Sequence, residues 1–586
     1  MLGKKRWLSG RGVVVRVGKT VKQTAWLLVV VLLPACYIHA GGTPVPAAES
    51  ASTTLELESA QAAVHPEDSA RKAAAAARKL DISRYLPRSA AEGFPQPDEQ
   101  GRLELSVEEA VIMALANNRA LGIQLHQPLV AGTFAEQERA VFDPSLFAEA
   151  AANREKSPLD DDYRRHEAEE YRLGLEKELA TGTDLELALE QRRSETDPAD
   201  PADAVVPRHR AAAQLSLTQA LLRGGSREAN LAGVRRADLE VLASLYELRG
   251  FTQDLVAEVE RAYWDLVLAE SRIAIYRQSL EVARSQLQDV RRRIEVGTVA
   301  DVERAAAEAE LAFRRQGLID GESRRDRARL ELLNLINPGS PLAPTAFKSG
   351  VEGDGTPASG RDIWEIQPVP RQEPDIPQVK PDPVVEHVAL SRQMRPDLDE
   401  ARLRLEQGKL EVIQTRNGLL PRLDLFITLG KTGYADSFGR SFREITDDST
   451  YAGSMGLRFS LPLGNRDAGA VDARARVERA RAEGSLENLT QLAELDVRRA
   501  HLEAHRARNQ IEASAERRRL QEEVLRVEEA KFEVGRSTAL NVAQAQRDLL
   551  ESQLAEVDAR IAYRLALTEL YRLDGSLLAR RNIAAR

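Results

Sequence analysis

The longest pattern in the sequence is a seven-residue repeat of apolar side chains within residues 226–296. No proline interrupts this run, so at ~1.5 Å per residue it predicts one helix about 100 Å long. Large apolar residues occupy one repeat position and mostly alanine occupies the position three further on, which predicts a coiled-coil seam with closely spaced helices. The first position holds Val259, Leu266, Ile273, Leu280, Leu287 and Ile294, and the second holds Ala262, Ala269, Tyr276, Ala283 and Val290.

The same arrangement occurs a second time along the chain. The offset that carries Gly297 to Gly535 also aligns apolar and alanine positions on both sides of each glycine. A second proline-free run covers residues 466–534, and a shorter helical run follows each glycine, over residues 299–336 and 537–573. We therefore predict an internal duplication in which each half holds an antiparallel helical hairpin that turns at its glycine.

Four segments outside the helical runs alternate apolar and polar residues, as strands between lipid and a wet lumen do. A further hairpin over residues 146–180, with Leu173, Leu175 and Leu179 in it, has no assigned place. Because a membrane barrel needs at least eight strands, the strands of one chain cannot close, and several identical chains must share one barrel. The four segments are residues 184–190, 213–218, 423–429 and 455–461.

The N-terminus predicts export. Basic residues precede the short apolar run Trp26–Leu33 within residues 1–35, as in a secretory signal. The next residues, through Cys36, resemble a bacterial lipobox, which implies acylation of Cys36; an incidental cysteine in an ordinary signal peptide is the alternative. Cys36 is the single cysteine, so no internal disulfide is expected. Tyr37 follows it, and in lipoproteins of enteric type a residue other than aspartate implies sorting to the outer membrane.

Composition and residue spacing argue against nucleic-acid binding, metal binding and catalysis. The net charge is -9 and only 5% of residues are aromatic, which suits long solvated helices and argues against a nucleic-acid partner. His501 and His505 lie one helical turn apart, but no third ligand is apparent and helix packing explains them better than metal binding. No catalytic grouping stands out, so we expect no enzyme activity, no cofactor and no metal.

Acidic residues gather near the two predicted turns. In a symmetric oligomer they would form rings that attract cations at an entrance, although most such charges only solvate a helix. These candidate entrance residues are Asp301, Glu303, Glu528, Glu529 and Glu533.

Several short motifs, in order along residues 105–575, resemble those of the TolC-like outer-membrane efflux family. The resemblance implies mainly α structure with a membrane β-barrel part: a trimeric α-barrel of duplicated hairpins, and about four strands per protomer in a shared outer-membrane β-barrel. The motifs are Leu105–Ala110 with Ala114–Asn118, Phe142–Pro144, Leu217–Gly225, Tyr263–Leu266, Arg395–Leu398, Leu461–Gly464 and Ala543–Gln546.

The resemblance also implies partners. In the family a periplasmic adaptor docks at a valine-glycine-threonine turn at the helical tips; Val296, Gly297 and Thr298 match it, and Val534, Gly535 and Arg536 match it in part. Asp301 departs from the family pattern, because many relatives place a proline there, and Arg395 is set further from the preceding Ala-Leu pair than is usual.

We therefore expect a lipid-anchored homotrimer in the outer membrane of a Gram-negative-type bacterium that extends into the periplasm. It would be a passive conduit for efflux or type I secretion, opened at its tips by the adaptor and an inner-membrane pump. The alternatives are a coiled-coil envelope lipoprotein without transport, and a periplasmic metallohydrolase that uses the histidine pair. The expected parts are a signal peptide at 1–35, an anchored spacer at 36–104, repeats at 105–338 and 384–575, a Pro/Gly-rich segment at 339–383 and a tail at 576–586.

Overall fold

The computed structural model divides the chain into two units, Met1–Ala63 and Val64–Arg586, and all the described residues lie in the second. The expected export signal, Cys36, most of the N-terminal spacer and much of the inter-repeat segment lie outside the described residues. The described residues are 95, 97–159, 162–196, 208–298, 300–338, 362–375, 380–447 and 450–583.

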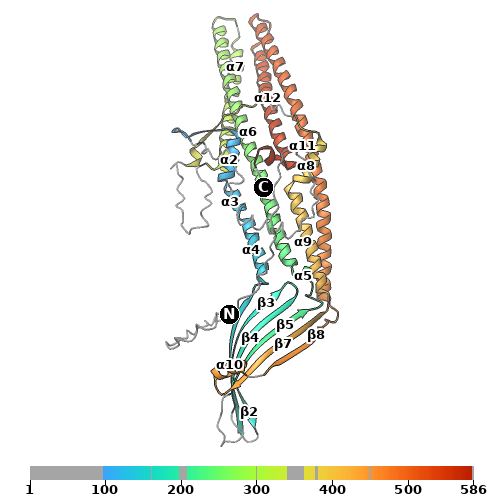
Figure 1. The fold of residues 1–586 in the computed structure, drawn as a ribbon. Coiled ribbons are helices and arrows are strands. Elements are labelled where there is room, and N and C mark those ends of the chain that lie inside the picture. Colours follow the sequence, from blue (N-terminus) through green and yellow to red (C-terminus); the bar gives the residue numbers. More distant parts are fainter. Residues whose placement is uncertain are drawn as a thin grey trace, which may run out of the picture. The chain divides into compact units, whose positions relative to one another are not determined.

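Two long helical hairpins are present, as predicted (Figure 1). Helix α6 (Ala232–Glu295) has 64 residues and α11 (Arg466–Glu533) has 68. Each turns back at its glycine into a 35-residue helix, α7 (Val302–Ile336) or α12 (Ala539–Leu573). A separate short turn, α5 (Arg227–Asn230), precedes α6, so the first run is not one unbroken helix at its start.

The predicted seam of α6 is buried. Val259 is 0% exposed, Leu266 1% and Leu287 6%. Tyr276 is only half-buried, and its ring lies against α7 where Gly317 removes a side chain; a Cβ there would lie 2.4 Å from Cε1 of Tyr276. The sequence predicted that small residues on α6 let neighbouring helices approach closely. The approach of α6 and α7 also depends on Gly317 of α7.

The strands form one antiparallel sheet in the order β2-β3-β4-β5-β7-β8. The four predicted strand segments lie in its last four strands, and the hairpin over residues 146–180 supplies β2 and β3. The sheet thus has six strands where the family resemblance implied about four, because the hairpin that had no assigned place joins the sheet through β4. The strands are β2 (Ser145–Leu159), β3 (Asp162–Leu179), β4 (Thr183–Thr196), β5 (Arg208–Ala220), β7 (Arg422–Ala435) and β8 (Ala452–Ser460).

The inter-repeat segment supplies an element that its composition did not predict. Strand β6 (Gln367–Pro370) pairs in parallel with β1 (Arg102–Leu105), which ends the expected N-terminal spacer. Ile366, just before β6, is 3% exposed and belongs to the main apolar core. The Pro/Gly-rich sequence gave no sign of this strand, because four residues are too few to show a hydrophobic period.

The main core lies where short helices, α2 (Val107–Asn117) above all, pack against α6, the middle of α11 and the C-terminal parts of α7 and α12. Leu105 and Tyr263, from two of the family-like motifs, meet there: the Tyr263 hydroxyl donates to the Leu105 carbonyl at 3.1 Å. Besides the long hairpins and α5, the described helices are α2, α3 (Arg119–Gln124), α4 (Gln127–Ala140), α8 (Val384–Met394), α9 (Pro396–Gly418), α10 (Phe438–Asp447) and α13 (Leu577–Arg580), with a 3-10 turn, η3 (Ile363–Glu365). Within the described ranges, no helix is both long and apolar enough to cross a membrane.

Candidate functional site

The first tip closes with a left-handed glycine. Gly297 has φ +77°, a conformation that costs glycine little and other residues more. Its N–H donates to the Ile294 carbonyl at 2.9 Å, and the Thr298 N–H donates to the Arg293 carbonyl at 2.9 Å. This pair of bonds is the Schellman motif, which satisfies carbonyls left open at a helix end.

The second tip repeats the first. Gly535 has φ +74°, and its N–H donates to the Phe532 carbonyl at 3.1 Å, while the Arg536 N–H donates to the Lys531 carbonyl at 2.8 Å. The two tips differ at the following residue: the Thr298 hydroxyl also bonds the Arg293 carbonyl, at 2.9 Å, and arginine has no hydroxyl to do so.

Each tip presents an exposed valine. Val296 is 73% exposed and Val534 70%. The glycines beside them have no other atom within 4 Å of an added Cβ, so within this chain both turns are open. An exposed apolar side chain on an open turn is suited to fill a small pocket on a partner.

Below the turns the two hairpins contact each other. Leu287 and Val290 of α6 form an apolar cluster with Ala307 of α7 and Ala539 of α12. The Arg293 guanidinium lies 4.9 Å from the centre of the Phe532 ring, within the range of a cation–π contact. The two hairpins are therefore in contact with each other close to their turns.

A buried ion pair that sequence reasoning missed lies between the hairpins. Nη2 of Arg314 is 2.6 Å from Oε1 of Glu310, and these side chains are 1% and 7% exposed. Burial lowers the pKa of Arg314, while the Glu310 charge acts in the opposite direction. Arg547 of α12 reaches the other carboxylate oxygen at 3.6 Å. The sequence could not indicate this burial, because the same i,i+4 spacing of opposite charges occurs on most exposed helices.

Two of the five candidate entrance acids are paired locally. Asp301 is 3.4 Å from Arg304, and Glu528 binds Lys531 at 2.6 Å and Ser537 at 2.9 Å. The lysine hydrogen bond lowers the pKa of Glu528. The remaining three, Glu303, Glu529 and Glu533, lie in the last or first turns beside the tips.

The sheet carries two different faces. In one row across the strands, Leu175, Leu187, Leu215 and Leu429 stand opposite one another in register, and each is at least 40% exposed. Exposed leucines in adjacent strands form a continuous apolar surface of the kind that contacts lipid or a partner.

The opposite face is polar. The row next to the leucines runs across five strands, and each residue in it pairs with the next. Its members are Glu176, Glu186, Ser216, Thr428 and Ser454. A sheet with one apolar and one polar face fits a wall between lipid and water.

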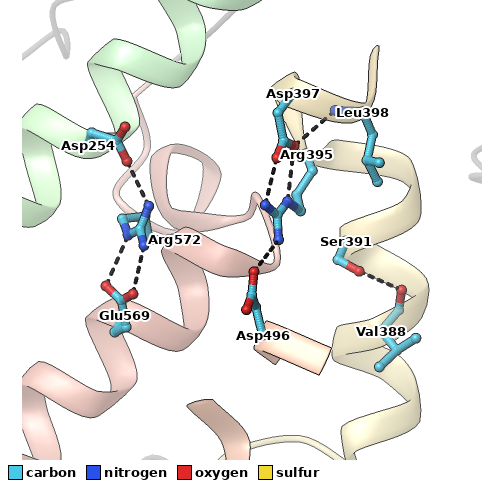
Figure 2. A network of polar contacts seen from close by, with 9 residues as sticks. All are labelled: Asp254, Val388, Ser391, Arg395, Asp397, Leu398, Asp496, Glu569 and Arg572. Atoms are coloured by element: carbon cyan, nitrogen blue, oxygen red, sulfur yellow. Dashed lines mark hydrogen bonds and ion pairs between the residues drawn. The ribbon is translucent and has the colours of Figure 1, made fainter. Parts of the chain in front are cut away.

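The second-repeat motif Arg395–Leu398 anchors the start of α9 (Figure 2). Arg395 donates to both carboxylate oxygens of Asp397, at 3.0 and 2.6 Å, and lies 3.7 Å from Asp496 of α11. Asp397 also accepts the Leu398 N–H at 2.9 Å. The motif therefore has a structural role, joining α9 to the long helix of its repeat.

Arg572 joins the two repeats in the same region (Figure 2). From α12 it donates to Glu569 at 2.9 and 2.7 Å and to Asp254 of α6 at 2.8 Å. These hydrogen bonds raise the pKa of Arg572 and lower that of Glu569. Such a bridge is strongest while the carboxylates are ionised.

The two histidines His501 and His505 contact different groups. Nε2 of His501 lies 3.1 Å from the Asp382 carbonyl, and Nδ1 of His505 lies 3.2 Å from Asn509. No group of three or more His, Cys, Asp or Glu side chains in the described part of the chain could hold a metal ion. A buried pair that the sequence did not indicate, His387 with Asp574 at 2.6 Å, packs beside Tyr571.

Comparisons with known proteins point to one family. The model described as Outer membrane efflux protein matches residues 184–338 and 388–576. OprJ, an outer membrane protein of Pseudomonas aeruginosa, is 26% identical over 486 residues, 81% of this chain and 84% of OprJ. The alkaline protease secretion protein AprF of the same species is 26% identical over 232 residues, 39% of this chain; the match spans only 42% of AprF. The solved structure of the outer-membrane channel OprN superposes with a TM-score of 0.57 at 19% identity, covering 86% of this chain and 95% of OprN.

Proposed function

This chain belongs to the outer membrane efflux protein family, and from that membership we propose that it is a passive conduit across the outer membrane and periplasm. It is an outer-membrane channel of the class that serves efflux and secretion systems. The observation that carries the proposal is the pairing of two open glycine tips with a sheet of one apolar and one polar face, at opposite ends of the same long helices (Figure 1).

The conduit is a homotrimer in this proposal. Among the described strands, the outer edges of β2 and β8 have no partner, and Met455 and Leu457 of β8 are 76% and 65% exposed. An unpaired strand edge beside an exposed apolar face is unfavourable for a lone chain. Pairing β2 of one protomer with β8 of the next would satisfy the edges and close a shared β-barrel around the polar face.

The tips dock a periplasmic adaptor, and the adaptor connects them to an inner-membrane pump. Two tips of similar backbone conformation per protomer, each with an exposed valine, would give the adaptor six related positions around a trimer in this arrangement. The family consists of channel proteins, so we assign no catalytic step to this chain; the pump supplies the energy.

Three further assignments belong to the same proposal. Cys36 carries the lipid anchor, strand β6 and the described residues beside it lie around the middle of the tunnel, and the acids beside the tips attract cations at the entrance. Glu303, Glu529 and Glu533 contribute most to that field, because Asp301 and Glu528 are already paired with cations of their own helices.

Conductance tests the channel. Full-length protein, purified with its natural N-terminal processing, is inserted into planar lipid bilayers, and discrete ion-conducting steps are expected. The alternative of a structural envelope lipoprotein predicts an intact oligomer and no conductance, and that result would remove the conduit.

Photo-cross-linking tests the tips. A benzophenone amino acid replaces Val296 in cells that also produce the adaptor, and a covalent adaptor product is expected. The same probe at Val477, which lies on α11 far along the chain from the turn and is 68% exposed, is the matched control. Equal capture at both positions would contradict docking at the tip.

A further inference from the structure

Helix α10 lies on the apolar side of the sheet. It joins β7 to β8 and packs over β7 and β5. A Cβ added to Gly433 of β7 would lie 2.2 Å from the Ser441 carbonyl oxygen of α10. Gly433 has the same parity along β7 as Leu429, and alternate residues of a strand face the same side. The helix therefore covers the face that carries the leucines.

The position of α10 along the strands follows from the pairing register. Gly433 belongs to a row that continues through Ala211 and Gln191 to Tyr171. Oγ of Ser441 lies 3.3 Å from Oε1 of Gln191, so the helix rests on this row. The row is four residues beyond Leu429, about 13 Å at ~3.3 Å per residue, on the side away from the long helices (Figure 1).

The residues around this row mark a boundary. On the same face, Lys431 follows Leu429 along β7. The row of Gly433 holds Gln191 on β4 and Tyr171 on β3, whereas the row of Leu429 holds leucines on both strands. Strands of a membrane wall change in this way where hydrocarbon gives way to the headgroup layer, and aromatic residues concentrate there.

The helix is amphipathic about a short aromatic stripe. Phe438, Phe442 and Ile445 follow the i, i+4, i+7 spacing of one helix face, and the rings of the two phenylalanines are 5.3 Å apart. Phe438 is nevertheless 55% exposed. Arg440 and Arg443 lie on the opposite face and are exposed.

We propose that α10 is an interfacial anchor that lies in the headgroup layer of the outer leaflet. Phe438 and Phe442 contact the upper acyl carbons, and Arg440 and Arg443 face the headgroup phosphates. The lipid surface is the occupant because the stripe continues the apolar face of the sheet and sits where that face ends. This inference rests on the proposed function, since it takes the leucine face of the sheet as the lipid-facing one.

Depth-dependent quenching tests the anchor. Phe438→Trp is made in the full chain, which is reconstituted into vesicles of phosphatidylethanolamine and phosphatidylglycerol with bromine placed either near the headgroup or deep in the acyl chain. The unsubstituted protein gives the background from the native tryptophans. The expected result is a blue-shifted emission that shallow bromine quenches more than deep bromine does.

Two matched variants separate the inference from its premise. Leu429→Trp, within the leucine row, should be quenched most by deep bromine; if it is not, the lipid-facing assignment of the sheet fails. Tyr434→Trp, beside Gly433 but on the opposite face and also exposed, should be unaffected by either lipid.

The remaining outcomes overturn the anchor alone. If Leu429→Trp behaves as expected while aqueous iodide quenches the Phe438→Trp indole, α10 lies in water. If neither bromine nor iodide quenches that indole, another copy of this chain or another protein covers the helix instead of lipid.

Discussion

Replacing Gly297 with valine should loosen the first tip without disturbing the rest of the molecule. No other atom lies within 4 Å of an added Cβ, so the cost is one of backbone conformation alone. At φ +77° a side chain costs about 1–2 kcal/mol, and reduced freedom of the open state offsets part of this. The full cost would raise the local opening constant by roughly 5- to 30-fold, and the offset places the net rise toward the lower end of that range.

Hydrogen exchange followed by mass spectrometry measures this opening. The N–H groups of Gly297 and Thr298 are protected by their bonds to the end of α6, so the peptide that contains them should exchange faster in Gly297→Val. Peptides from the core around Val259 should keep their protection. Adaptor capture at the tip should weaken only by the factor by which the folded fraction of the turn falls, because the folded turn is the form that binds.

The matched control is Gly297→Asn. Asparagine adds a side chain but adopts the left-handed conformation more readily than other non-glycine residues, so its exchange should stay close to that of the unsubstituted protein. Equal loss of protection in the valine and asparagine variants would refute the conformational argument. Loss of protection along all of α6 would show instead that the turn holds the whole hairpin.

Three other substitutions test the core and its charges. Leu332→Ala, at a position that is 0% exposed, should cost about 2–5 kcal/mol of stability, seen as a lower melting temperature in detergent. Gly317→Val should destabilise the α6–α7 hairpin by about 1–3 kcal/mol, because its side chain would overlap the Tyr276 ring, and Tyr276→Leu should restore part of the loss. Glu569→Gln should lower stability by roughly 1 kcal/mol at neutral pH, because it removes the charge that Arg572 binds.

The pH dependence of the last variant has a definite sign. Hydrogen bonding to Arg572 lowers the pKa of Glu569 below its ordinary 4.5, so the folded state binds fewer protons than the unfolded state between these two values. The carboxylate therefore stabilises the fold fully above pH 4.5 and loses that effect as pH falls through the folded pKa. The melting-temperature gap between the unsubstituted protein and Glu569→Gln should close over this acidic range.

Each of these three substitutions has a control or an outcome that would contradict it. Leu330→Ala, on the same helix but 41% exposed, should change stability by less than about 0.5 kcal/mol; an equal effect at Leu330 and Leu332 would contradict the core assignment. A Gly317→Val penalty that persists unchanged with Tyr276→Leu would place the strain elsewhere. A gap that stays constant with pH would exclude ionised Glu569 as its cause.

The sequence alone determined the elements whose signals are local. A seven-residue repeat specifies a long helix with one buried stripe, and a glycine after the last apolar position specifies its end, so α6, α7, α11 and α12 were predicted within a few residues of their bounds. Alternation with period two likewise specified the four strands in the second part of the sheet. The family-like motifs then indicated the class of protein that the comparisons identify.

Tertiary structure decided what depends on partners distant in the chain. The register that brings β2 and β3 into the sheet, the strand β6 and the burial of Arg314 beside Glu310 leave no periodic trace in the sequence. The same holds for Gly317 beneath Tyr276 and for α10 on the leucine face, because a short helix specifies its own stripe but not the surface on which it rests. Local spacing fixes which face of an element is apolar, and only packing between elements fixes what that face meets.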